Sequence, residues 1–306
     1  MELVLNLYKN LLPVISFIFI GYFIKKKLHF NSKFISIPLI YFLLPILVIY
    51  NVTEASIEKI IILPAMSFLL ALGMNLPAIL SHRTFAGKEN LFLLKTSFTF
   101  FNVAFFGIPV ITALFGKEEI STLICVYLGT ALYGNTIGYY QVAKTKFSTK
   151  KSLLELLKIP YLYVYILAVI IKILAFDFPD EADPVMDVVS WTVSAAGMMV
   201  VGLNLINLNL KKIDFPYFSG LLGIKIIGAA ILLGFIVLAE YLIIQKLEVI
   251  DYLILALLPV FPIASNVSLF ASFLGTEEER FSLFVLLSII VSLILVPIAA
   301  QFLPDL

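Results

Sequence analysis

Long apolar stretches alternate with short polar or charged segments along the whole chain. An apolar run of about 18 residues or more is a candidate membrane span, because about 20 residues of helix cross the hydrocarbon core. The pattern predicts an all-α integral membrane protein with ten transmembrane helices and little length left for a soluble domain. The predicted spans are 4–24, 34–53, 58–80, 90–115, 118–143, 159–176, 185–209, 215–244, 249–274 and 278–303.

Composition supports this class and excludes several others. Of the 306 residues, 61% are hydrophobic and 13% are charged, against about 25% charged in an average soluble domain. A net charge of +1 gives no reason to expect nucleic-acid binding. The single Cys125 excludes an internal disulfide and a cysteine metal cluster. No metal and no cofactor are predicted, and the lipid bilayer is the expected surrounding.

The distribution of positive charge predicts the orientation. Lys25, Lys26 and Lys27 follow the first apolar run, whereas a cleavable signal peptide carries its charge before that run. This run is therefore read as a retained span with its N-terminus outside. With ten spans, 14 of the 21 Lys and Arg residues fall in inner loops and 4 fall outside, as the positive-inside rule requires. The C-terminus is then also outside, and the protein is placed in the plasma membrane or a bacterial inner membrane.

Two of the predicted spans are interrupted in the middle. Asn102 to Pro109 and Pro259 to Ser268 bring proline, glycine and asparagine into otherwise apolar helices. Proline lacks a backbone donor and clashes with the preceding turn. Lipid cannot satisfy the carbonyls that this frees, so such a break survives only inside protein or beside a water-filled cavity. A pair of broken helices in matching positions of two halves is typical of a transporter binding site.

An internal repeat relates the two interruptions. Leu114–Glu119 matches Phe273–Glu278 at a shift of 159 residues, and each segment ends an interrupted span. Five spans per half force the two halves into opposite orientations, which predicts inverted repeats over residues 1–150 and 151–306. The basic segment 144–158 is interpreted as a loop that separates the halves and orients the chain.

The broken helices predict an anion site. The half-helix after each break exposes backbone N–H groups with partial positive charge, which bind a carboxylate. Neighbouring amides and hydroxyls would donate further hydrogen bonds. The alternative is that these groups cap the breaks and join neighbouring helices. The candidate substrate-binding residues are Asn102, Gly107, Pro109, Asn135, Pro262, Ser265, Asn266 and Ser268.

Lys225 lies about ten residues into the eighth span, close to the membrane midplane. Ionisable residues at this depth are functional candidates, and Lys225 would attract the anion or exchange a proton. The alternatives are a lysine that faces a polar cavity or extends to the inner surface. No Asp or Glu lies at mid-membrane, which argues against a sodium site and against a carboxylate proton relay.

Four segments resemble the auxin efflux carrier family, which includes plant PIN-formed carriers and bacterial organic-acid permeases. They are Leu44-Pro45, Asn102 to Pro109 with the following Leu114-Phe115-Gly116, Gly202 to Leu205, and Pro262 to Asn266. The resemblance implies two inverted five-helix halves whose broken helices 4 and 9 cross near the midplane, as in bile-acid symporters. It also implies a scaffold of helices 1, 2, 6 and 7 and a transport domain of helices 3, 4, 5, 8, 9 and 10. Family members carry organic anions such as auxin, malate or malonate, and a homodimer through the scaffold follows by analogy.

The sequence therefore favours a secondary transporter that moves a small organic anion, auxin-like or a mono- or dicarboxylate, by an elevator-like alternating access. A sodium-coupled symporter of the bile-acid type is one alternative, and a non-transporting membrane sensor is another. An intramembrane enzyme is not expected, because the spans contain neither an H-E-x-x-H pair nor paired aspartates. Substrate identity, direction of transport and coupling ion are left open.

Overall fold

The computed structural model of the chain describes residues 2–54, 61–116, 118–158, 160–174, 176, 178–179, 181–206 and 213–303. Every regular element in this described part is helical. Seven helical stretches are long and apolar enough to cross a membrane, so the prediction of a helical membrane protein is confirmed. They are Leu5–Leu28, Lys33–Thr53, Ile62–Thr84, Ile120–Lys144, Ala182–Asn204, Phe215–Ile244 and Glu278–Ala300.

These stretches coincide with seven of the ten predicted spans, and several of them are built from consecutive helical pieces. The elements up to residue 144 are α1 (Glu2–Leu28), α2 (Lys33–Pro38), η1 (Leu39–Leu43), α3 (Leu44–Glu54), α4 (Ile62–Gly73), α5 (Asn75–Thr84), α6 (Leu91–Thr99), α7 (Gly107–Leu114), α8 (Ile120–Tyr133), η2 (Gly134–Gly138) and α9 (Tyr139–Lys144). The later elements are α10 (Thr149–Lys158), α11 (Tyr161–Ile173), α12 (Ala182–Asn204), α13 (Phe215–Ala239), η4 (Glu240–Ile244), α14 (Val249–Ala256), η5 (Leu258–Val260), α15 (Asn266–Leu274) and α16 (Glu278–Ala300). Residues 58–60, 159, 175 and 207–209 of the predicted spans lie outside the described residues.

The basic segment 144–158 corrects one prediction, because most of it is the helix α10 rather than a loop. Leu153, Leu154 and Leu157 on this helix are about half exposed, beside lysines at 150, 151 and 158. This spacing places leucines on one side of a short basic helix, which is typical of a helix lying in the membrane interface. The charge of the segment hid this amphipathic pattern from the sequence interpretation.

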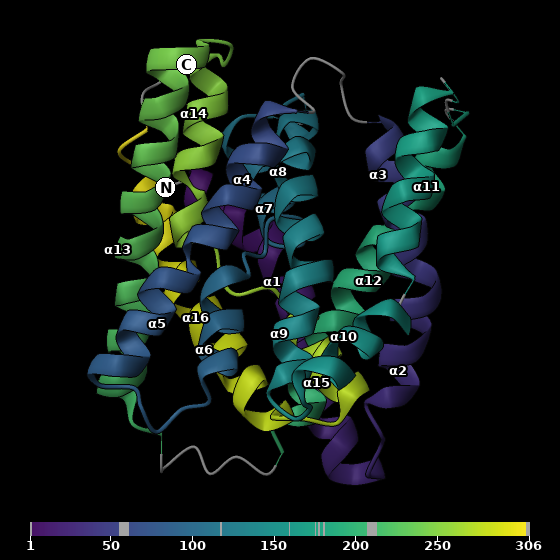
Figure 1. Cartoon of the computed structure of the whole chain (residues 1–306). Coiled ribbons are helices and arrows are strands. Elements are labelled where there is room, and N and C mark those ends of the chain that lie inside the picture. The colour runs from purple at the N-terminus through teal and green to yellow at the C-terminus, as the bar shows by residue number, and fades with distance from the viewer. Residues whose placement is uncertain are drawn as a thin grey trace.

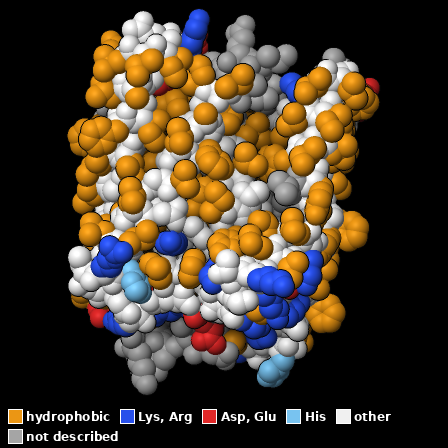
Figure 2. Space-filling model, in the orientation of Figure 1, with side chains coloured by type: hydrophobic (Ala, Val, Ile, Leu, Met, Phe, Trp, Pro, Cys, Tyr) orange, Lys and Arg blue, Asp and Glu red, His pale blue; other side chains and the backbone are white. Residues whose placement is uncertain are grey.

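The helices form a bundle with two flanks (Figure 1). α13 and α14 stand on one flank, and α2, α3 and α11 stand on the other, while α10 and α15 lie near one end. α1 packs along α12, α3 packs along α11, and α4 packs along α8. Figure 2 shows hydrophobic side chains over most of the visible face, with Lys and Arg side chains gathered at the lower end. This distribution is that of a surface covered by lipid, with a basic rim at one interface.

Glycines allow α1 and α12 to pack backbone against backbone. A Cβ atom at Gly202 would lie 1.9 Å from the carbonyl oxygen of Ile18, and one at Gly21 would lie 2.1 Å from that of Met199. Small residues at such crossings are typical of helix pairs in membranes, where close van der Waals packing drives association. The α1–α12 pair is therefore fixed by these two glycines.

Replacing Gly202 with alanine is expected to lower the free energy of unfolding by about 1–3 kcal/mol, the usual cost of overpacking a tight contact. The matched control is Gly220→Ala in α13, where a Cβ atom would meet nothing within 4 Å. That control should stabilise the helix by up to about 1 kcal/mol, because alanine is the better helix former. Thermal unfolding of the purified protein in detergent measures both, and equal unfolding temperatures would contradict the close-packing account.

Candidate functional site

The two interrupted spans are broken in the structure, and their breaks meet. α6 ends at Thr99 and α7 begins at Gly107, while η5 ends at Val260 and α15 begins at Asn266. The backbone N–H of Asn102 donates to the carbonyl oxygen of Pro262 at 2.8 Å, which joins one break to the other. The loops 100–106 and 261–265 together are called the crossover below.

Local sequence explains why the second break is extended. Phe261 has φ −71° and ψ 143°, the extended conformation that a following proline imposes on the residue before it. Its ring packs edge-on against Phe106 of the other break, with 5.9 Å between ring centroids. Gly107 begins α7 beside the same ring, where a Cβ atom would approach Phe261 to 2.9 Å. Proline, glycine and two aromatic rings thus hold the crossover in place.

Two asparagine side chains at the crossover carry buried polar atoms without partners. Among the described residues, nothing bonds to Nδ2 of Asn102 or to Oδ1 of Asn266, and the hydroxyl of Ser265 is also unpaired. They do not cap the half-helices, because neither α7 nor α15 has a side-chain capping bond at its start. A buried polar group left without a partner costs about 1–3 kcal/mol. Such a cost indicates a site that a bound molecule completes.

A small cavity lies against these asparagines. Its volume is about 20 Å³, which is room for about one water molecule. Asn102, Asn135 and Asn266 line it together, with Phe101, Phe105, Tyr127 and Thr130 among the other walls. Asn135 reaches it from η2, a single π-helical turn within the fifth predicted span, and such turns are frequent at functional sites.

The remaining predicted site residues are placed in different ways. Pro262 supplies the carbonyl that Asn102 bonds, and Pro109 lines a larger neighbouring cavity. Ser265 is buried against α12, where a Cβ atom at Gly197 would lie 2.8 Å from its hydroxyl. Ser268 accepts a hydrogen bond from Ser282 of α16 at 3.0 Å and does not line the small cavity. Three asparagines are thus brought together, while Gly107, Ser265 and Ser268 support the surrounding packing.

A second, larger cavity lies beside the first break. Its volume is about 470 Å³, and it is lined by parts of α3 and α12, by Ala104 and Phe105 of the first break and by Pro109 of α7. Its charged lining residues are Asp183 and Asp187, and Asp183 accepts a 2.7 Å hydrogen bond from the hydroxyl of Tyr50. A void of about 30 Å³ lies between the two cavities, and Ala104 and Phe105 line all three spaces. Among the described residues, no group of three or more His, Cys, Asp or Glu is arranged to hold a metal ion.

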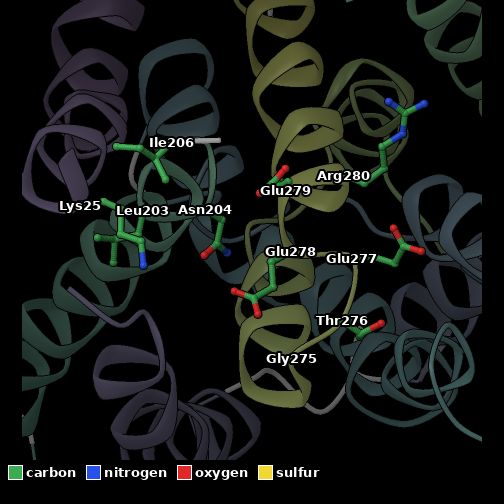
Figure 3. A pocket seen from close by; sticks show the side chains of 10 residues that line it. All are labelled: Lys25, Leu203, Asn204, Ile206, Gly275, Thr276, Glu277, Glu278, Glu279 and Arg280. Atoms are coloured by element: carbon green, nitrogen blue, oxygen red, sulfur yellow. The ribbon is translucent and has the colours of Figure 1, made fainter. Parts of the chain in front are cut away.

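The opposite end of α12 is held by a buried polar cluster. Nδ2 of Asn204 donates to Oγ of Ser272 at 2.8 Å, and Oγ of Ser272 donates to Oγ of Ser32 at 2.9 Å. This Ser32–Asn204–Ser272 cluster joins α12 and the α1–α2 loop to α15. Beyond it lies an open cavity of about 630 Å³, where Asn204 and Glu278 project toward one another from α12 and α16 (Figure 3).

Lys225 reaches the crossover from α13. Its side chain is 2% exposed, and its Nζ lies 3.9 Å from the centroid of the Phe101 ring. None of the described residues forms an ion pair or a hydrogen bond with this amine. A desolvated cation–π contact contributes about 2 kcal/mol, whereas burying an ion costs several kcal/mol. The Phe101 contact alone therefore does not compensate a charge at this position.

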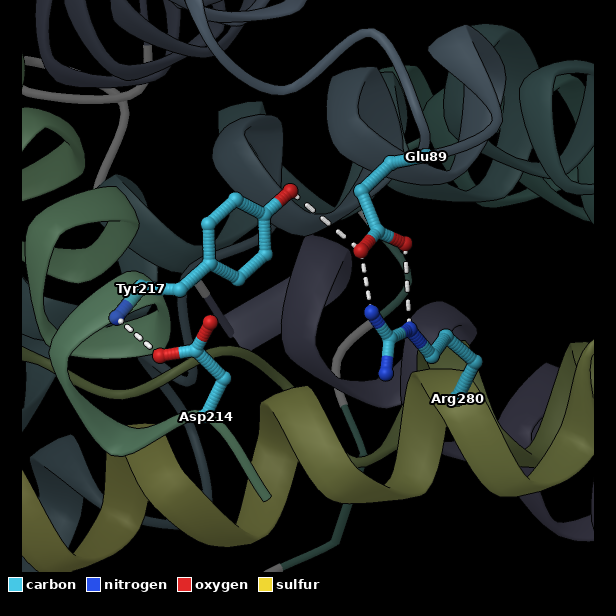
Figure 4. A network of polar contacts seen from close by, with 4 residues as sticks. All are labelled: Glu89, Asp214, Tyr217 and Arg280. Atoms are coloured by element: carbon cyan, nitrogen blue, oxygen red, sulfur yellow. Dashed lines mark hydrogen bonds and ion pairs between the residues drawn. The ribbon is translucent and has the colours of Figure 1, made fainter. Parts of the chain in front are cut away.

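A salt-bridge network fixes the start of the first broken helix (Figure 4). Glu89 is 7% exposed just before α6, and Nε of Arg280 donates to its Oε2 at 3.0 Å. Nη2 of Arg280 donates to the other carboxylate oxygen, and the hydroxyl of Tyr217 donates to that oxygen at 3.3 Å. α6, α13 and α16 are thereby joined at one carboxylate.

Replacing Glu89 with alanine is expected to lower the free energy of unfolding by about 3 kcal/mol, because it leaves a partly buried arginine unpaired. Adding Arg280→Ala should recover part of this loss. Glu155→Ala is the matched control, since Glu155 pairs with a 63% exposed Lys158 and such surface pairs contribute about 0–1 kcal/mol. Equal losses for Glu89→Ala and Glu155→Ala in detergent unfolding would argue against the network.

The sequence interpretation missed the aromatic and hydroxyl walls of the small cavity. Phe101, Phe105, Tyr127 and Thr130 line it, but 27 phenylalanines and 14 tyrosines are spread along the chain. The one sequence signal that could have identified these four is their closeness in sequence to Asn102 and Asn135. In comparisons with known proteins, no family model and no curated protein matches this chain.

Proposed function

We propose that the protein is a secondary transporter that carries a small organic anion by alternating access, with its site at the crossover. The observation that carries this proposal is that Asn102 and Asn266 line one cavity where two broken helices meet, each with one buried amide atom that no described residue bonds. A buried site with unsatisfied donors and acceptors is suited to a ligand that binds and leaves. Its volume of about 20 Å³ is too small for an organic acid, so binding requires the walls to separate.

The half-helices support an anion as the cargo. α7 and α15 both begin at the crossover, and α15 begins with Asn266 itself. The first N–H groups of each helix lack helical partners and carry partial positive charge. Among the described residues, no carboxylate lines the small cavity. This weakens the alternative of a sodium-coupled symporter, because a dehydrated sodium ion favours oxygen ligands that often include a carboxylate.

The packing supports ten spans in two inverted halves. α6–α7 and α14–α15 each count as one broken span, and α11 adds one to the seven uninterrupted helices. The predicted helices 1 and 7 correspond to α1 and α12, which pack on each other. In an inverted repeat the equivalent pair is helices 6 and 2, which correspond to α11 and α3, and these also pack on each other. Gly116 and Gly275, at equal places in the repeat, both have positive φ, at 98° and 65°. Residues 1–150 and 151–306 are the two repeats in this proposal.

The cavities support an alternating-access cycle. The large cavity that Asp183 lines reaches the first break at Ala104 and Phe105, while the Ser32–Asn204–Ser272 cluster joins helices of the two proposed bodies at the other end of α12. Ser32 and Asn204 belong to the proposed scaffold of α1–α3, α11 and α12. Ser272 belongs to the proposed transport domain of α4–α9 and α13–α16. An elevator-like movement between these bodies would break the cluster and open the site to the basic, inner face.

Uptake of radiolabelled malate, malonate and indole-3-acetate into proteoliposomes tests the function, with protein-free liposomes as the control. Sodium and pH gradients are imposed separately, so that the coupling ion is read from the same experiment. Saturable uptake of any one acid supports the proposal. Uptake that requires sodium would support the bile-acid-type alternative. No uptake by protein shown to be folded would favour the sensor.

A further inference from the structure

Lys225 occupies a place where the proposed carrier meets its cargo. Its Nζ faces the Phe101 ring at 3.9 Å, and Phe101 is also a wall of the cavity that Asn102 and Asn266 line. Phe101 therefore contacts both the amine and the space in which an anion would bind. Phe101 and Asn102 are consecutive residues of the first break, so a movement of this loop affects both contacts.

The surroundings of Lys225 provide no fixed countercharge. α4, η5 and the loop 100–106 carry no ionisable residue, although α4 and η5 both pack against α13. The other elements packed on α13 carry their ionisable residues near helix ends. Glu240 lies 15 residues after Lys225 in the sequence, which is about 22 Å of helix. These groups are His82 and Arg83 of α5, Glu278, Glu279 and Arg280 of α16, Glu240 and Tyr241 of η4, and Asp251 and Tyr252 of α14.

We infer that Lys225 binds a proton together with the transported anion, so that transport is coupled to protons. The inference rests on the proposed function and names its coupling ion. A carboxylate bound at the crossover is the countercharge that the empty site lacks, and a bound anion and a bound proton then favour each other by linkage. Without the anion, none of the described residues gives the buried amine an ion pair or a hydrogen bond, and the Phe101 contact alone does not compensate its charge.

The cycle balances in protons and charge. On one side of the membrane, a carboxylate enters the site and the neutral amine takes one proton from water, giving a carboxylate–ammonium pair. The pair carries no net charge for a monocarboxylate, so it crosses the midplane without the cost of moving a charge. On the other side the carboxylate leaves, the ammonium returns its proton to water, and the neutral amine remains.

Calorimetric titration measures the protons taken up on binding, using malate, malonate and indole-3-acetate in turn and two buffers with different ionisation enthalpies. The wild-type protein should take up close to one proton for each anion bound. Lys225→Arg should bind the anion with no proton uptake, because its guanidinium is always charged. Lys225→Met should bind at least about tenfold more weakly, again without proton uptake.

Lys95→Met is the matched control, because Lys95 lies over the Phe92 ring at 5.3 Å in α6 and does not line the crossover cavity. It should keep both the affinity and the proton uptake of the wild type. Anion binding by the wild type without proton uptake, or unchanged proton uptake in Lys225→Arg, would overturn the inference and leave the carrier intact. Binding of none of the three acids by folded protein would instead overturn the proposed function.

Discussion

Replacing Asn102 and Asn266 together with alanine should abolish anion binding while changing the stability of the empty protein by less than about 1 kcal/mol. Among the described residues, Nδ2 of Asn102 and Oδ1 of Asn266 are unpaired in the empty site, so their removal also relieves a desolvation cost. Hydrogen bonds to a charged ligand contribute about 1.5–3 kcal/mol each. Losing two of them corresponds to at least about a hundredfold weaker binding. Thermal unfolding with and without malate, malonate or indole-3-acetate measures both effects.

Asn204→Ala provides the matched control for that prediction. Asn204 is also buried, but its amide is paired with Ser272. Its replacement should lower the free energy of unfolding by about 1–3 kcal/mol, since it leaves partners unsatisfied. If the Asn102→Ala, Asn266→Ala variant loses as much stability as Asn204→Ala and is still stabilised by anion, the two asparagines are structural.

Cross-linking the Ser32–Asn204–Ser272 cluster should stop transport reversibly. With Ser32→Cys and Ser272→Cys, the two side chains replace hydroxyls that lie 2.9 Å apart on the α1–α2 loop and α15. A disulfide there would fix the two proposed bodies in one arrangement, and alternating access needs both arrangements. Uptake should fall at least about tenfold on oxidation and return on reduction.

The single variants, treated with the same oxidant, are the controls for the cross-link. The native Cys125 stays in place, because it is buried in α8 and distant in sequence from both positions. Full transport by protein whose cross-link is shown on a gel would mean that the cluster does not open during the cycle. The elevator-like movement would then be wrong, although the crossover site would stand.

The two helix breaks could be predicted from the sequence alone, because each is caused by residues within the break itself. Pro262 removes a backbone donor and Gly107 permits close approach to Phe261, whatever the rest of the chain does. Lipid imposes continuous helix elsewhere, so an interruption of an apolar span is a strong signal. The helical membrane class followed from the same physics, and the seven uninterrupted helices confirm it. Asn102 and Asn266 lie in these breaks, whereas Asn135 is a candidate because its position matches the family that the chain resembles, and the three line one cavity.

The other walls of the site depend on which helix faces meet, and uniformly apolar spans do not encode this. Ser268 was expected to face the substrate, but its helix turns it toward Ser282. Phe101 and Tyr127 resemble many other aromatic residues in the chain until the fold places them around one cavity. The segment that forms α10 is predicted to be a loop because of its lysines, since a charged segment of this length is also typical of a loop.

Solute counterflow tests the central claim most directly, because it requires a carrier with one site that alternates between two sides. Proteoliposomes are loaded with unlabelled malate, malonate or indole-3-acetate and diluted into a trace of the labelled acid. The account predicts a transient accumulation of label with the wild-type protein, and none with the Asn102→Ala, Asn266→Ala variant. Equal accumulation in both would contradict the crossover site, and no accumulation of any acid by folded wild-type protein would contradict the carrier itself.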